Sequence, residues 1–110
     1  MTWQPSNEPW SEQYRIIGEE WADAEAAASL LEDTKTSVLA QKMSMLGDIP
    51  VNKAEMTIKA TPDWHSYLAK IVAARKEANI LKVRMEYLKM KYHEEQGHEA
   101  SRRVEMRITS

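Results

Sequence analysis

The sequence has no cysteine and no phenylalanine, and only three glycines and four prolines among its 110 residues. Without cysteine, disulfides and thiolate metal sites are excluded, and nothing indicates an oxidising compartment. So few glycines and prolines leave few places to turn, which favours a few long elements over many short ones. No segment approaches the apolar length that crosses a membrane. The polar start MTWQPSNEPW lacks the features of a signal peptide, so we expect a cytoplasmic protein.

Catalytic motifs are also missing. The sequence contains no glycine-rich phosphate loop, no Gly-x-Ser-x-Gly and no His-Glu-x-x-His. Glu95 and His98 have the spacing found in di-iron helical bundles, but such a site needs a second copy of the motif, and none occurs here. We therefore expect no enzymatic activity, no cofactor and no metal.

What the sequence does have is an abundance of helix-forming residues and clear signals for helix ends. They predict a single all-α domain over residues 1–110: a helix over about 9–46, a turn at 47–51, a short helix over about 52–60, and a long helix over about 62–96 that could continue to 107. Gly47 and Pro50 are expected to stop the first helix. Asn52 and Glu55 fit a capping box for the second helix, and Thr61 fits the N-cap of the third. Gly18 could divide the first helix, and Gly97 could end or kink the last one.

Both long helices carry an apolar seam with steps of three and four residues. In the last helix the seam comprises Trp64, Tyr67, Ile71, Ala74, Ala78, Leu81, Met85, Leu88 and Tyr92. Folding the chain back predicts a long antiparallel helical hairpin in which large residues meet small ones. The proposed register places Ala24 opposite Met85 and Trp21 opposite Leu88.

Charge is divided unevenly along the chain. Residues 1–50 hold nine acidic and three basic residues, a net charge of −6, whereas residues 51–110 hold eight acidic and twelve basic residues, a net charge of +4. In the hairpin register, Glu32 lies between Arg75 and Lys82, and Glu25 lies between Lys82 and Lys89. The two helices are therefore expected to pair acid with base, which selects partner and orientation.

A second apolar series lies on the opposite face of the last helix: Ile80, Val83, Tyr87 and Met90. One intrachain neighbour cannot cover both faces of a helix, and a large exposed apolar patch usually marks an interface. We therefore expect self-association, most simply a dimer forming a four-helix bundle with the last helices central. The alternative is that the short middle segment and the tail fold over this face.

The basic residues of the last helix raise the question of nucleic-acid binding. Bases beside aromatic side chains suit single strands, so Arg75, Lys82, Arg84, Lys89 and Lys91 are candidate contacts. Arg102 and Arg103 form a second possible phosphate contact. Such a charge run beside a seam is more usually a solvated helix face. Trp3, which precedes every expected helix, is a possible docking anchor.

The segment ARKEANILKVRMEYLKMKYHEEQGHEASRRVEMR, residues 74 to 107, carries Ala-Arg-x-x-Ala-Asn, Lys-Val-Arg-x-Glu-Tyr and Glu-Ala-x-x-Arg-x-Glu-Met-Arg. It resembles a group of small all-helical bacteriophage and prophage proteins encoded near recombination and replication genes. The resemblance covers the last third of the chain, carries no catalytic residue, and implies an accessory role in phage DNA metabolism in the host cytoplasm.

Three functions therefore remain open. The first is a non-enzymatic phage accessory protein that binds a DNA-processing protein, nucleic acid or both. The second is a single-stranded nucleic-acid-binding module that uses the basic face of the last helix. The third is an inhibitor of a host nuclease or defence enzyme, acting through its acidic first helix or its apolar face.

Overall fold

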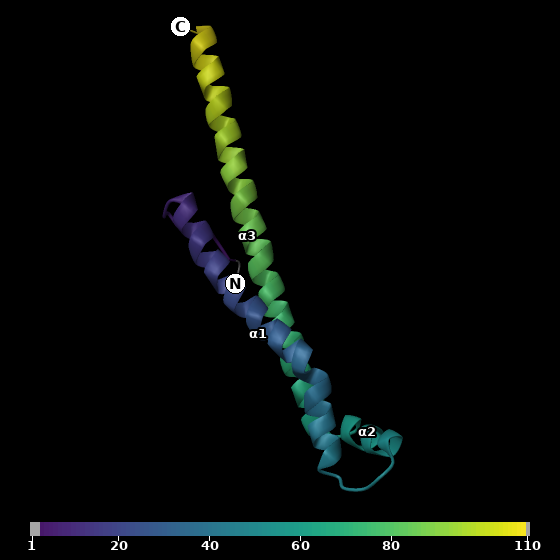
Figure 1. Cartoon of the computed structure of the whole chain (residues 1–110). Coiled ribbons are helices and arrows are strands. Elements are labelled where there is room, and N and C mark those ends of the chain that lie inside the picture. Colours follow the sequence, from purple (N-terminus) through teal and green to yellow (C-terminus); the bar gives the residue numbers. More distant parts are fainter. Residues whose placement is uncertain (1–2, 110) are drawn as a thin grey trace. The chain divides into compact units, whose positions relative to one another are not determined.

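The computed structural model describes residues 3–109, which form three helices (Figure 1). Helix α1 spans Trp10–Ser44, α2 spans Val51–Lys59 and α3 spans Pro62–Thr109. These confirm an all-α fold with a short helix between two long ones. The chain groups into two compact units: unit 1 contains Met1–Trp21 and Ile80–Ser110, and unit 2 contains Ala22–Asn79. The unit boundary passes through both long helices and does not coincide with a linker.

Helix α1 begins and ends close to the predicted positions. The Pro9 carbonyl accepts the amide hydrogens of Glu12 and Gln13 at 3.0 and 3.1 Å, so the proline directly precedes the first turn. After Ser44 the chain tightens into a turn, and Gly47 adopts the left-handed conformation with φ of 88°. Only glycine takes this conformation without steric penalty, which confirms its predicted role in stopping the helix.

The predicted capping box of α2 is wrong. Pro50 is the N-cap residue, with φ −55° and ψ 141°, and no side chain caps this end. Because the proline ring already fixes φ near a helix-compatible value, the helix starts one residue earlier, and Asn52 lies inside it. Glu55 instead pairs with Lys59 one turn later, at 2.7 Å.

Helix α3 starts as predicted but extends further. The Thr61 hydroxyl oxygen accepts the Trp64 amide hydrogen at 3.2 Å, and Pro62 occupies the first helical position. The helix continues through Gly97 to Thr109, which confirms the continuation to 107 that the sequence left open and excludes an end or kink at Gly97. A single glycine costs a helix only about 1 kcal/mol, and strong helix formers flank this one.

The predicted seam of α3 is largely confirmed by burial. In unit 2, Trp64, Ile71 and Ala78 are buried together with Ala28 of α1 and with Ala54 and Ile58 of α2. In unit 1, Leu81 and Leu88 are buried together with Ile17 of α1. In unit 2, Glu32 meets Arg75 and the later Leu39 lies near the earlier Trp64. In unit 1, Trp10 meets Glu95 and the later Gly18 lies near the earlier Met85. The two long helices therefore run antiparallel in each unit.

In unit 1 the predicted register of the hairpin is wrong by about one to two helical turns. Met85 packs against Gly18, not Ala24: a Cβ built on Gly18 would lie 3.8 Å from the Met85 methyl carbon. Trp21 lies beside Lys82, Met85 and Glu86 instead of Leu88. The prediction set the register from hairpin geometry with a short helix between the two long ones, and that geometry does not fix the alignment within unit 1. A large residue, Met85, still packs against a small one, but the small residue is Gly18.

An N-terminal arm, residues 3–9, folds back onto the start of α1. The buried Gln13 side chain fixes it, because its amide oxygen accepts the Ser6 amide hydrogen at 3.0 Å and its amide group donates to the Glu8 carbonyl at 2.6 Å. A buried glutamine is tolerated when both ends of its amide are hydrogen-bonded.

Replacing Gln13 with alanine is expected to release this arm. The substitution removes both hydrogen bonds and leaves the Ser6 amide without its partner, an effect of about 1–3 kcal/mol on the arm. The Ser6 amide should then exchange its hydrogen markedly faster, while the helix content by circular dichroism stays constant. Gln4→Ala is the matched control, since Gln4 is exposed; equal exchange rates in both variants would contradict this role.

Candidate functional site

Arg75, a candidate nucleic-acid contact, is occupied within unit 2. Its guanidinium donates to both carboxylate oxygens of Glu32, at 2.9 and 2.6 Å, and to Glu25 at 2.6 Å. The predicted Glu32 pairing is confirmed, and Glu25, which was predicted to lie between Lys82 and Lys89, bonds Arg75. The guanidinium fork has enough donors to bridge two carboxylates two helical turns apart. Arg75 therefore joins α1 to α3 within this unit.

This bridge makes stability depend on pH. Hydrogen bonding from Arg75 lowers the pKa of Glu32 from its ordinary value of 4.5, and the carboxylates raise the pKa of Arg75. Because the folded-state pKa of Glu32 is depressed, its contribution to stability is present above pH 4.5 and is lost as the pH falls below it.

We expect Arg75→Met to reduce this pH dependence. Between neutral pH and about pH 3, the melting temperature of the unaltered chain should fall further than that of the variant, because only the former loses the bridge. Lys76→Met is the control, since Lys76 is exposed next to Arg75. A thermal melt at each pH checks this; identical pH slopes for Arg75→Met and the unaltered chain would contradict it.

Arg84 lies beside the N-terminal arm in unit 1. Its guanidinium carbon is 5.6 Å from the centre of the Trp3 ring, a cation–π contact. The Trp3 ring also meets Tyr87 edge to face, with ring centres 5.9 Å apart. Trp3, considered above as a docking anchor, thus covers one edge of the second apolar face of α3. The tail does not fold back over this face, because residues 97–109 continue α3 as helix.

The other candidate basic residues are more exposed. Lys82 and Lys89 line a shallow hollow of about 180 Å³ together with Tyr14, Trp21, Met85 and Glu86. The Lys91 amine lies 4.0 Å from a carboxylate oxygen of Glu94, and the Arg103 guanidinium lies 4.0 Å from a carboxylate oxygen of Glu99. Arg102 is exposed on the same segment as Arg103. The structure therefore brings Lys82 and Lys89 next to aromatic rings, while Arg102 and Arg103 lie on the far part of α3.

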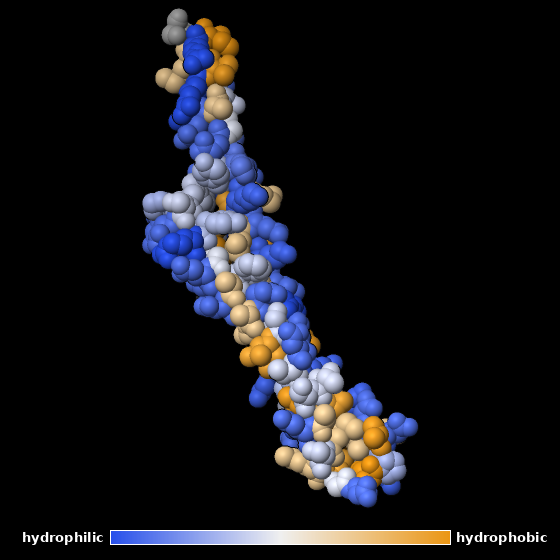
Figure 2. All heavy atoms as spheres, in the orientation of Figure 1, coloured by the Kyte–Doolittle hydropathy of each residue, from blue (hydrophilic) through white to orange (hydrophobic). Residues whose placement is uncertain are grey.

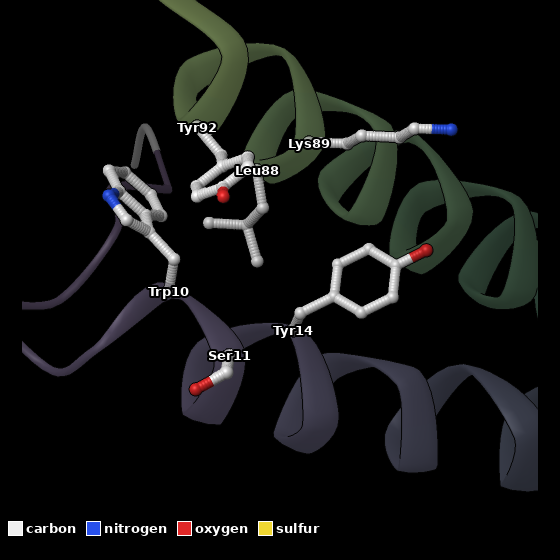
Figure 3. A pocket seen from close by; sticks show the side chains of 6 residues that line it. All are labelled: Trp10, Ser11, Tyr14, Leu88, Lys89 and Tyr92. Atoms are coloured by element: carbon white, nitrogen blue, oxygen red, sulfur yellow. The ribbon is translucent and has the colours of Figure 1, made fainter. Parts of the chain in front are cut away.

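A second hollow, of about 250 Å³, opens where α1 begins (Figure 3). It is lined by Trp10, Ser11, Tyr14, Leu88, Lys89 and Tyr92. The Trp10 indole N–H donates to the Glu95 carboxylate at 2.7 Å. The sequence assigned Tyr92 to the seam, but Tyr92 and its neighbour Tyr14 are 41% and 44% exposed. The spacing of apolar residues does not show where along a seam the side chains stop being buried.

The second apolar face of α3 was also indicated by the sequence. Ile80 is half-buried, whereas Val83, Tyr87 and Met90 are 63%, 39% and 61% exposed. Leu81 and Leu88, on the face turned to α1, are only 4% and 2% exposed. The outer stripe, meaning Ile80, Val83, Tyr87 and Met90, is thus an apolar surface with little intrachain cover.

The described residues offer no group of three or more histidine, cysteine, aspartate or glutamate side chains that could hold a metal ion. Glu95, one half of the spacing considered above, is engaged by Trp10. Across residues 3–109, none of the helices combines the length and apolar character that a bilayer crossing requires.

No protein-family model, curated protein or solved structure matches this chain. The fold defines its class: an all-helical protein of three helices whose described surface carries an exposed apolar stripe and no metal cluster.

Proposed function

We propose that this chain is a non-enzymatic accessory protein that works by protein–protein association through the outer stripe of α3. The observation that carries this proposal is the contrast between two faces of one helix. Leu81 and Leu88 are buried, while Val83 and Met90 are more than 60% exposed only two residues further along the chain in each case. A soluble helix normally exposes polar side chains on the face turned away from its neighbour.

Self-association is the simplest use of such a stripe, because the same surface is present on every copy. A two-fold dimer buries identical patches against each other and removes exposed apolar area worth about 25 cal/mol per Å². A four-helix bundle with both α3 helices central is one form of this dimer.

The biological setting we propose comes from the resemblance of residues 74–107 to phage and prophage proteins. It suggests an accessory role in recombination or replication in the host cytoplasm, beside a DNA-processing protein. In that setting the dimer would present two copies of the remaining surface to its partner, which raises the effective affinity.

Light scattering on the full chain over a range of concentrations tests self-association. The expected result is a molar mass of twice 12.7 kDa that falls towards 12.7 kDa on dilution. A monomer at every concentration would contradict the proposal.

One observation favours a second function, the binding of single-stranded nucleic acid. Lys82 and Lys89 line the same hollow as Tyr14 and Trp21. Exposed amines beside aromatic rings suit the phosphates and bases of a single strand. In this form Lys82, Lys89, Lys91, Arg102 and Arg103 would contact phosphates, while Arg75 is engaged by its two carboxylates and Arg84 lies over the Trp3 ring.

Binding of a labelled oligonucleotide at two salt concentrations tests this alternative. A nucleic-acid-binding protein should lose affinity steeply with salt, in proportion to the number of phosphate contacts. Lys82→Gln with Lys89→Gln should reduce that slope by about two contacts. The absence of binding at low salt would exclude the alternative and leave the first proposal intact.

A further inference from the structure

The outer stripe continues along α3 into the C-terminal segment. After Met90, steps of four and three residues lead through Glu94, Gly97 and Ser101 to Val104 and Ile108. Val104 and Ile108 are 54% and 78% exposed. We call this series the tail stripe: Ile80, Val83, Tyr87, Met90, Glu94, Gly97, Ser101, Val104 and Ile108. Figure 2 shows hydrophobic side chains at the C-terminal end of α3.

In unit 1 the end of α3 has no neighbouring helix along much of its length. Helix α1 begins at Trp10, which bonds Glu95, and α3 continues beyond that point (Figure 1). Every side chain from Tyr92 to Ile108 is exposed. A helical segment of this length whose side chains are all exposed is marginal in water, so the apolar side chains Val104 and Ile108 point to a partner.

Gly97 adds an independent observation. A Cβ placed on it would meet nothing within 4 Å, so the fold of the chain itself does not need a glycine there. A glycine inside an exposed helix costs about 1 kcal/mol relative to alanine. A residue without a side chain in the middle of the tail stripe is explained if another helix approaches closely at that point.

We propose that a second copy of this chain covers the tail stripe, with the two α3 ends antiparallel and the two-fold axis passing between Glu95 and Gln96. Antiparallel pairing about that axis places Val83 opposite Ile108, Tyr87 opposite Val104, and Met90 opposite Ser101 of the second copy. At the centre, Glu94 faces Gly97, which leaves room for its carboxylate. Larger side chains thereby meet smaller ones in three of the four layers.

Charges flanking the stripe favour this alignment. Arg84 comes opposite Glu105 of the second copy, and Glu86 comes opposite Arg107, and symmetry makes each pair occur twice. In antiparallel coiled coils such flanking pairs select register and orientation. Trp3, which lies against Arg84 and Tyr87, then forms part of the rim.

Two competing alignments are less favourable. In a four-helix bundle whose 80–90 segments face each other antiparallel, Arg84 would oppose Arg84 and Glu86 would oppose Glu86. A parallel pair would allow Glu86 to meet Lys91, but it would also stack Glu94 on Glu94 and Gly97 on Gly97, which combines like-charge repulsion with a cavity. The tail-to-tail register avoids both defects.

This inference rests on the proposed self-association, and cysteine cross-linking separates the two. The chain has no native cysteine, so Glu94→Cys and Gly97→Cys can be introduced singly into the full chain and mixed under a thiol redox buffer. Both positions are exposed, so folding is expected to survive. The tail-to-tail register predicts that mixed Glu94→Cys/Gly97→Cys disulfides exceed the statistical half of the cross-linked product. Lys89→Cys with Arg103→Cys, at similar heights but off the stripe, is the control pair and should give no such excess.

Each outcome is decisive. An excess of mixed disulfides supports the register. A dimer by light scattering that gives disulfides between identical positions, a statistical mixture or no disulfide overturns the register but leaves self-association in place. A monomer by light scattering overturns both.

Discussion

Substitution of Val83 and Met90 by glutamate is expected to convert the dimer to a monomer. Both side chains are more than 60% exposed within one chain, so the variant should fold with unchanged helix content and melting behaviour at high dilution. In the dimer each glutamate would lie in an apolar interface, where an unpaired charge is strongly unfavourable. A loss of about 3 kcal/mol in association weakens dimerisation about 100-fold.

The matched control for this variant is Val72→Glu. Val72 is on the same helix and is 67% exposed, but it lies outside the tail stripe. Sedimentation velocity on both variants checks the prediction. If Val72→Glu dissociates the dimer as strongly as the stripe variant, or the stripe variant remains dimeric, the outer stripe is not the interface.

The second large effect concerns Trp64. This side chain is 2% exposed and borders Leu39 of α1 and Glu55 of α2, so all three helices meet around it. Truncating a buried tryptophan to alanine removes its transfer free energy and leaves a cavity, at a total cost of about 3–5 kcal/mol. We expect Trp64→Ala to lower the urea midpoint of unfolding substantially, because the free energy of unfolding of a native protein is only a few times larger than this loss.

Trp10→Ala provides the comparison for Trp64→Ala. Trp10 is only half-buried and makes one hydrogen bond, to Glu95, at the edge of unit 1. Its removal should cost far less. Equal urea midpoints for the two variants would show that Trp64 does not hold unit 2 together.

The parts of the fold that could be predicted from the sequence are those set by local chemistry. Thr61 and Pro62 begin α3, and Gly47, with its positive φ, lies in the turn that follows α1. Both features depend on only a few neighbouring residues, so they can be predicted locally. The buried face of α3 followed equally from its three- and four-residue steps. These signals need no knowledge of the partner helix.

Alignment of α1 against α3 was beyond local reasoning. The alignment depends on the path of the chain through α2 and on which small residue of α1 packs against Met85. That residue is Gly18, whereas the sequence predicted Ala24. Glu25 likewise reaches Arg75 because one guanidinium can hold two carboxylates, a choice that spacing alone does not reveal.

The candidate site could be predicted only where a repeating sequence pattern marks it. Periodicity identified Val83, Tyr87 and Met90, since an apolar residue on a solvated face stands out in the sequence. It did not identify the arm, because Trp3 and Gln13 act through single contacts without any repeat. Continuation of α3 past Gly97 was left open by the sequence, because a glycine can also end a helix.

Amide hydrogen exchange of residues 97–109, measured at a low and a high concentration of the full chain, tests the central claim most directly. If a second copy covers the end of α3, these amides should be slowly exchanging at high concentration and should exchange many-fold faster once dilution separates the copies. Exchange rates in this segment that do not change with concentration, while light scattering reports a dimer at the higher one, would contradict the account and locate the interface elsewhere.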